Sequence, residues 1–100
     1  LTKSQVQNAQ EIFLFNNRLQ ATEEHHAIRR YKELMKEDHK IIALRTAVRE
    51  SAEAKLEHGI IDVNNLLQEI IKENEAKTNL STHEIEMLKH IYELKHTVNQ

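Results

Sequence analysis

Only one residue in this chain is well suited to reversing its direction. Proline is absent, and Gly59 is the only glycine among the 100 residues. Because proline and glycine are the residues that most often interrupt helices and build turns, this chain has one favoured place to fold back. We therefore predict an all-α fold, a long antiparallel helical hairpin or coiled coil, as a single unit. The expected first helix covers about 3–57, the turn about 58–61 and the second helix about 62–98.

Apolar residues recur at heptad spacing in the first arm, which is typical of the seam of a coiled coil. The residues spaced by seven are Ala27, Leu34, Ile41 and Val48, and beside them on the same face are Ile28, Tyr31, Met35, Ile42 and Ala52. Upstream, four consecutive apolar residues at 12–15 cover most of the helix circumference. We expect this cluster to pack against further helices rather than to form a ligand site.

The second arm repeats the heptad spacing through Leu80, Met87 and Leu94. Ser81 and Glu84 have the spacing of a capping box and could begin a separate helix, but no Gly or Pro interrupts the run, so we expect one continuous helix. Folding back at Gly59 pairs residues whose numbers sum to about 120. This register predicts Tyr31 and Leu34 near residues 84–91.

Such a hairpin buries a narrow seam, so we expect it to gain stability by self-association. The net charge is −2, and the basic residues are interspersed with acidic ones, so nucleic-acid binding is not predicted. The chain has no Cys, no Gly-rich phosphate loop and no catalytic Ser-His-Asp order, so we predict that it is not an enzyme and has no cofactor. It contains no apolar run of the roughly 20 residues that cross a bilayer, and we expect it to be a fragment of a larger protein.

The segment around Gly59 has the features of a helical turn. His58 precedes the glycine, which can adopt the left-handed conformation that ends a helix. Asp62 follows and can cap the next helix through its carboxylate. Any helical hairpin needs these features, so the turn alone does not indicate a function.

A wider pattern does indicate one. The sequence from Glu50 to Gln100 resembles the tunnel-forming hairpin of TolC-type outer-membrane efflux proteins, especially Bacteroidetes-like members. The matching elements are a long helix ending in AEAKLEHG (52–59), a Leu-rich start in IIDVNNLL (60–67), the element ENEAKTNL (73–80), and the later HEIE (83–86) with Tyr92. The resemblance extends over about residues 30–98.

This resemblance implies a trimer whose helices form a periplasmic tube, coupled through an adaptor protein to an inner-membrane pump that exports small molecules. The isolated fragment is expected to form a dimer instead. The hairpin tip, formed by His58, Gly59, Ile60 and Ile61, would be the site where the adaptor docks. Alternatively, Ile60 and Ile61 would pack as a staple against the first turn of the second helix.

The resemblance also implies a channel entrance just beyond the tip, where better-known channels carry acidic residues. The matching positions here are the neutral Asn65 and Gln68, and the nearest acids are Asp62 and Glu69. We therefore expect weaker block by divalent cations at this entrance.

A metal site is the sharpest competing hypothesis, because Glu23–His26 and Glu93–His96 both have the Glu-x-x-His spacing of di-iron bundles. The register brings the two motifs near each other. Since such a centre needs two more inward-facing Glu residues, we predict no metal site, and adventitious Zn²⁺ or Ni²⁺ at the adjacent His25 and His26 at most.

The sequence leaves two questions open: whether two of the histidines face solvent or a channel, and whether the hairpin belongs to a channel. His83 and His90 lie seven apart and are expected on a solvated face, or else lining a water-filled channel. The hairpin could also be a stand-alone coiled-coil interaction module, such as an adaptor hairpin or a scaffold, because periodicity alone does not separate these from a channel wall.

Overall fold

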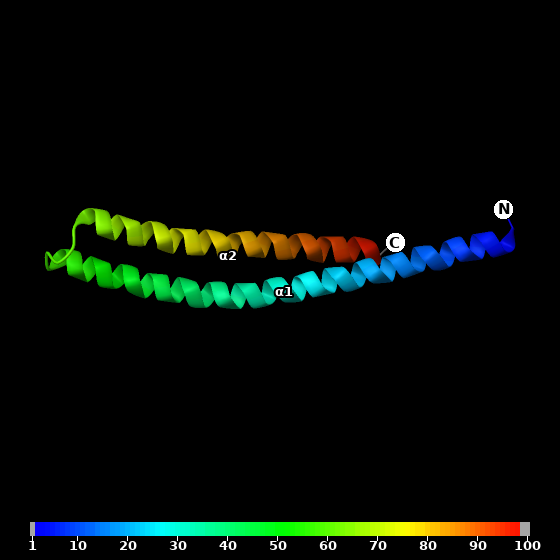
Figure 1. The fold of residues 1–100 in the computed structure, drawn as a ribbon, viewed down its shortest axis with the longest axis horizontal. Helices are drawn as coiled ribbons and strands as arrows, with labels where there is room; N and C mark the ends of the chain where they lie inside the picture. The colour runs from blue at the N-terminus through cyan, green and yellow to red at the C-terminus, as the bar shows by residue number, and fades with distance from the viewer. Residues whose placement is uncertain (1, 99–100) are drawn as a thin grey trace.

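A computed structural model describes residues 2–98 and contains two helices joined by a short turn, α1 over Lys3–Glu57 and α2 over Val63–Val98. The helices run antiparallel and pack along most of the length of α2 (Figure 1). The molecule measures 83 × 17 × 15 Å. A helix of 55 residues is about 82 Å long, so α1 alone sets the long dimension. The predicted all-α hairpin is confirmed.

Local hydrogen bonds explain where α1 begins and ends. Thr2 and Gln5 form a capping box, in which Gln5 N donates to Thr2 Oγ1 at 3.2 Å and Thr2 N donates to Gln5 Oε1 at 3.0 Å. At the other end, Gly59 has a φ of 71°. Its amide donates to Leu56 O, and the amide of Ile60 donates to Lys55 O, which is the Schellman pattern that satisfies the last carbonyls of a helix.

The start of α2 depends on Asp62, whose Oδ1 accepts a hydrogen bond from Asn65 N at 2.9 Å. From there α2 continues without a break to Val98, so the expectation of one helix through Ser81 is confirmed. Neither helix, within residues 2–98, is long and apolar enough to cross a membrane.

The seam between the helices follows a heptad pattern. The less exposed residues of α1 alternate four and three apart, and those of α2 do the same. In α1 they include Ala21, Glu24, Ile28, Tyr31, Met35, Asp38, Ile42, Arg45, Arg49, Ala52 and Leu56, and in α2 they include Leu66, Glu69, Glu73, Ala76, Leu80, His83, Met87, His90, Leu94 and Thr97. Leu80, Met87 and Leu94 therefore lie in the seam, as predicted.

The predicted seam of α1 is confirmed in part. The flanking residues Ile28, Tyr31, Met35, Ile42 and Ala52 lie in the seam, but the heptad series that begins at Ala27 was wrong by one residue. Leu34, Ile41 and Val48 are exposed, whereas Met35 and Ile42, their neighbours in the sequence, face α2. The first arm carries two adjacent apolar stripes, and periodicity alone does not tell which one the partner helix covers. The second stripe is left without a partner among the described residues.

The N-terminal part of α1 extends beyond the end of α2 (Figure 1). Residues 3–16 are all exposed, including the apolar cluster at 12–15. The cluster has no partner within the described chain, so packing with other helices remains its expected role.

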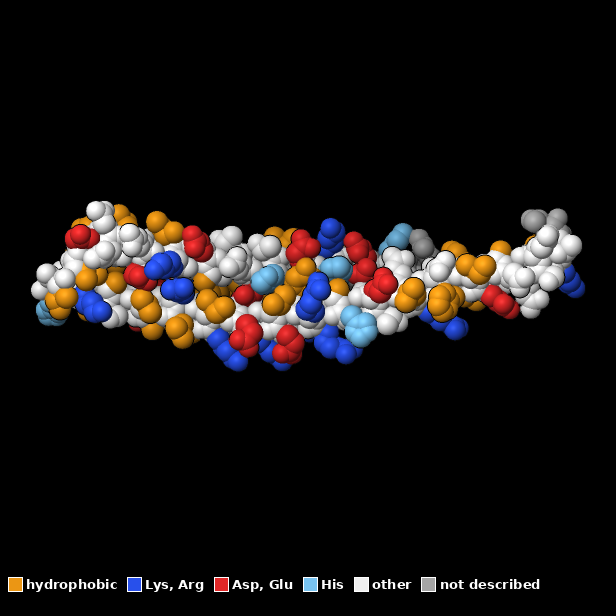
Figure 2. Space-filling view, in the orientation of Figure 1, with side chains coloured by type: hydrophobic (Ala, Val, Ile, Leu, Met, Phe, Trp, Pro, Cys, Tyr) orange, Lys and Arg blue, Asp and Glu red, His pale blue; other side chains and the backbone are white. Residues whose placement is uncertain are grey.

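The outward faces of the two helices differ in chemistry. On α1, Glu33 pairs with Lys36 and Glu37 with Lys40, both at the surface. Figure 2 shows charged side chains gathered along this edge of the molecule, near the middle of α1. On α2, large apolar side chains are exposed at Leu67, Ile71, Ile85, Leu88 and Tyr92. At 3.6 residues per turn, these five lie on the side of α2 turned away from the seam.

Candidate functional site

The seam is polar for a helical hairpin. Among the described residues, the buried apolar side chains are two alanines, Ala52 and Ala76, whereas the buried polar residues are Glu24, Asp38, Glu73 and Thr97. Buried carboxylates require partners, because an unpaired charge away from water is costly. The partners of the three carboxylates lie on the facing helix.

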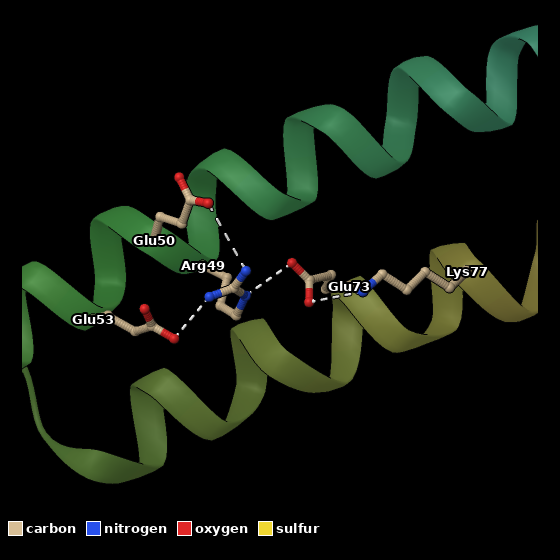
Figure 3. A network of polar contacts seen from close by, with 5 residues as sticks. All are labelled: Arg49, Glu50, Glu53, Glu73 and Lys77. Carbon is tan, nitrogen blue, oxygen red and sulfur yellow. Dashed lines mark hydrogen bonds and ion pairs between the residues drawn. The ribbon is translucent and has the colours of Figure 1, made fainter.

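Arg49 provides the partner of Glu73 (Figure 3). Its Nε donates to Glu73 Oε2 at 2.8 Å across the hairpin, and its Nη1 donates to Glu53 Oε1 at 2.7 Å within α1. Lys77 Nζ lies 3.5 Å from the other carboxylate oxygen of Glu73. The guanidinium thus joins two carboxylates through separate donors, an arrangement for which its planar fork is well suited.

These contacts shift the proton affinities of both groups. The hydrogen bond from Arg49 holds the pKa of Glu73 below its usual value of 4.5. The hydrogen bonds to Glu73 and then to Glu53 raise the pKa of Arg49 above its ordinary value. The pair is therefore fully charged at neutral pH.

Two histidine–carboxylate pairs join the helices farther from the turn. His83 Nδ1 lies 2.5 Å from Asp38 Oδ2, and His90 Nδ1 lies 2.5 Å from Glu24 Oε2. The ring of Tyr31 sits between the two histidines, stacked on His90 at 5.6 Å and tilted against His83 at 5.9 Å between ring centroids. The expected position of Tyr31 near residues 84–91 is confirmed. The expectation that His83 and His90 face solvent was wrong, because both rings are half-buried in the seam.

Among residues 2–98, the four Glu and His residues of the two Glu-x-x-His motifs do not form one cluster of ligand atoms. Glu23, His25, His26 and His96 are exposed. Instead, Glu24 approaches His90, and Glu93 Oε2 lies 3.9 Å from the same His90 nitrogen. One ligand atom from each of Glu24, His90 and Glu93 lies within 4.8 Å of the other two.

The hairpin tip presents the four residues expected there in different ways. His58 ends α1, and Gly59 makes the left-handed turn. Ile60 is 70% exposed in the turn between the helices. Ile61 is half-buried and lines a shallow hollow with Val48 and Ala52. The tip therefore offers one apolar side chain to a partner and turns the next one toward the hairpin.

The expected entrance residues lie together on one side of the turn. Asn65, Gln68 and Glu69 line the same shallow hollow as Ile61, and Asn65 and Gln68 are exposed. Asp62 uses a carboxylate oxygen to cap α2. Glu69 is half-buried, and its Oε1 lies 3.5 Å from Lys72 Nζ.

No protein-family model, curated protein or solved structure matches the chain. The features that bear on function are therefore the hairpin geometry, its exposed apolar faces and the sequence pattern around the turn.

Proposed function

We propose that this hairpin is a wall segment of a periplasmic helical tunnel in an outer-membrane efflux channel, which docks an adaptor protein at its tip. The observation that carries the proposal is the second apolar face on each paired helix. α2 exposes Ile85, Leu88 and Tyr92 on the side away from α1, and α1 exposes Leu34 and Ile41 beside its seam. A helix in a tube wall needs a neighbour on two sides, whereas a lone hairpin needs only one.

The extended arm of α1 supports the same proposal. The apolar residues at 12–15 are exposed on an arm that α2 does not reach. Exposed apolar patches of this kind mark protein–protein contacts. In the proposed trimer, neighbouring helices cover this arm, and the pump couples to the tunnel through the adaptor at the opposite end.

The turn supports docking at the tip. Ile60 projects at the end of a molecule 83 Å long, supported by the hydrogen-bonded turn at Gly59. A helical hairpin of the adaptor would bury this side chain. The neutral Asn65 and Gln68 lie one turn farther along, at the proposed entrance.

Disulfide trapping in the full-length protein tests the docking role. An Ile60→Cys variant is expected to cross-link to the adaptor when cysteines are placed along the adaptor's hairpin tip. A Lys40→Cys variant provides the matched control, because Lys40 is similarly exposed but lies on α1, twenty residues before Ile60. Absence of any cross-link from Ile60 and its neighbours, or equal trapping at Lys40, would contradict the proposal.

A stand-alone coiled-coil interaction module is the second candidate, and the polar seam favours it. The Arg49–Glu73 and Asp38–His83 pairs fix one register within a single hairpin without help from other helices. Membrane fractionation of cells that express the full-length protein separates the two candidates. A channel wall requires recovery with the outer membrane, whereas a scaffold would be recovered elsewhere.

A further inference from the structure

We propose that Glu24, His90 and Glu93 form a binding site for a divalent transition-metal ion that clamps the end of α2 to α1. The three residues come from both helices, and one ligand atom of each lies within 4.8 Å of the others. Among the described residues, these three form the group of His and carboxylate side chains whose ligand atoms come together. The inference concerns the seam and is independent of the proposed channel function.

The distances fit a site that needs only small side-chain rotations. In a tetrahedral Zn²⁺ site with bonds of about 2.0–2.2 Å, neighbouring ligand atoms are about 3.3 Å apart. His90 Nδ1 lies 2.5 Å from Glu24 Oε2 and 3.9 Å from Glu93 Oε2. Glu24 therefore has to move slightly away from the imidazole, and Glu93 slightly toward it.

The surroundings orient the central ligand. The His90 ring is stacked on Tyr31, with an interplanar angle of 25°, and its contact with Glu24 Oε2 directs Nδ1 toward that carboxylate. Glu24 is buried in the seam, which limits its side chain to small rotations. Ligands held by their neighbours lose less freedom when a metal binds.

The third ligand leaves the site accessible. The Glu93 side chain is 43% exposed, so a metal ion can enter from the solvent side, and water can occupy a remaining position. Two carboxylates and a neutral imidazole suit Zn²⁺, Mn²⁺ or Fe²⁺. An ion here joins residue 24 of α1 to residues 90 and 93 of α2, close to the C-terminal end of that helix.

A second set of similar residues provides an internal comparison. His83 is followed by Glu86 at the same spacing as His90 and Glu93, and it faces Asp38 across the seam. Its ligand atoms do not converge as those at His90 do.

Titration calorimetry with Zn²⁺ tests the site. We expect one ion per chain in the parent protein, and a loss of affinity of at least about tenfold in each of Glu24→Gln, His90→Gln and Glu93→Gln, because removing even an outer partner of a ligand costs that much. Glu93→Gln is the cleanest variant, since its exposed side chain is not needed for the seam. Circular dichroism confirms that each variant remains helical.

His83→Gln and the double variant His25→Gln/His26→Gln are the matched controls, and both are expected to keep the parent affinity. The visible spectrum of bound Co²⁺ should change in Glu93→Gln and remain unchanged in both controls. Unchanged affinity in Glu93→Gln and His90→Gln would overturn the site. Loss of binding in the double variant would show adventitious capture of the ion by surface histidines. Equal losses of affinity in His83→Gln and His90→Gln would show that the ion is not bound specifically at His90, and would also overturn the site.

Discussion

Arg49 Nε of α1 donates a hydrogen bond to Glu73 Oε2 of α2 at 2.8 Å, and the Glu73 side chain is only 6% exposed. The pair joins residues on either side of Gly59 and defines how the two helices align. Because the carboxylate is buried, its removal leaves a half-buried guanidinium with fewer partners.

Substitution of Glu73 should destabilise the hairpin more than substitution of a surface carboxylate. We expect Glu73→Gln to lower the urea midpoint of unfolding by more than Glu33→Gln does. Glu33→Gln, which breaks an exposed pair with Lys36, should remain within about 0.5 kcal/mol of the parent. Equal midpoints for the two variants would mean that the Arg49 pair does not stabilise the fold.

The same carboxylate makes stability depend on pH in acid. Its pKa is lowered in the folded chain, so the unfolded chain binds a proton first as the pH falls. The stabilisation from Glu73 is complete above pH 4.5 and is lost as the pH falls through the folded pKa. Thermal melts followed by circular dichroism should show the parent and Glu73→Gln converging below pH 4.5. A difference that grows in acid would contradict the assignment.

The turn depends on the backbone of Gly59 rather than on space around it. Its φ is 71°, and a Cβ added there would meet nothing within 4 Å. Gly59→Ala is therefore expected to cost about 1–2 kcal/mol, the cost of the left-handed conformation. Gly59→Asn should cost less, because Asn tolerates that conformation. Urea titrations that show no loss with Ala would contradict the turn.

Most of the fold can be predicted from the sequence, because the absence of Pro and the single Gly59 leave one place to reverse. Both helices, the turn and the position of Tyr31 follow from this. The sequence did not indicate which of the two adjacent apolar stripes of α1 faces α2. Ile41 and Ile42 are equally apolar, and the side that faces α2 also carries polar residues such as Asp38, whose partner His83 is 45 residues away in the sequence.

The cluster of Glu24, His90 and Glu93 was harder to predict, because its members also lie far apart in the sequence. The Glu-x-x-His spacing indicates Glu23, whereas Glu24 is the residue whose carboxylate approaches His90. A usable signal was present, since Glu24 is spaced by fourteen residues from Asp38, and His90 by seven from His83. Heptad multiples of this kind place residues on the same stripe of a helix.

The exposed face of α2 should drive self-association. We expect Ile85→Glu combined with Leu88→Glu to weaken association measured by sedimentation velocity, because charges would enter an apolar contact. Ala47→Glu provides the control, since Ala47 is exposed on the charged outward side of α1. An unchanged sedimentation coefficient in the double variant, or an equal decrease in the control, would exclude this face as the contact.

Conductance of the full-length protein in planar bilayers tests the central claim most directly. We predict open pores that divalent cations block only weakly, because Asn65 and Gln68 are neutral at the proposed entrance. The double variant Asn65→Asp/Gln68→Glu should restore strong block. Absence of pores, or strong block in the parent that the double variant leaves unchanged, would contradict the assignment of this hairpin to a channel wall.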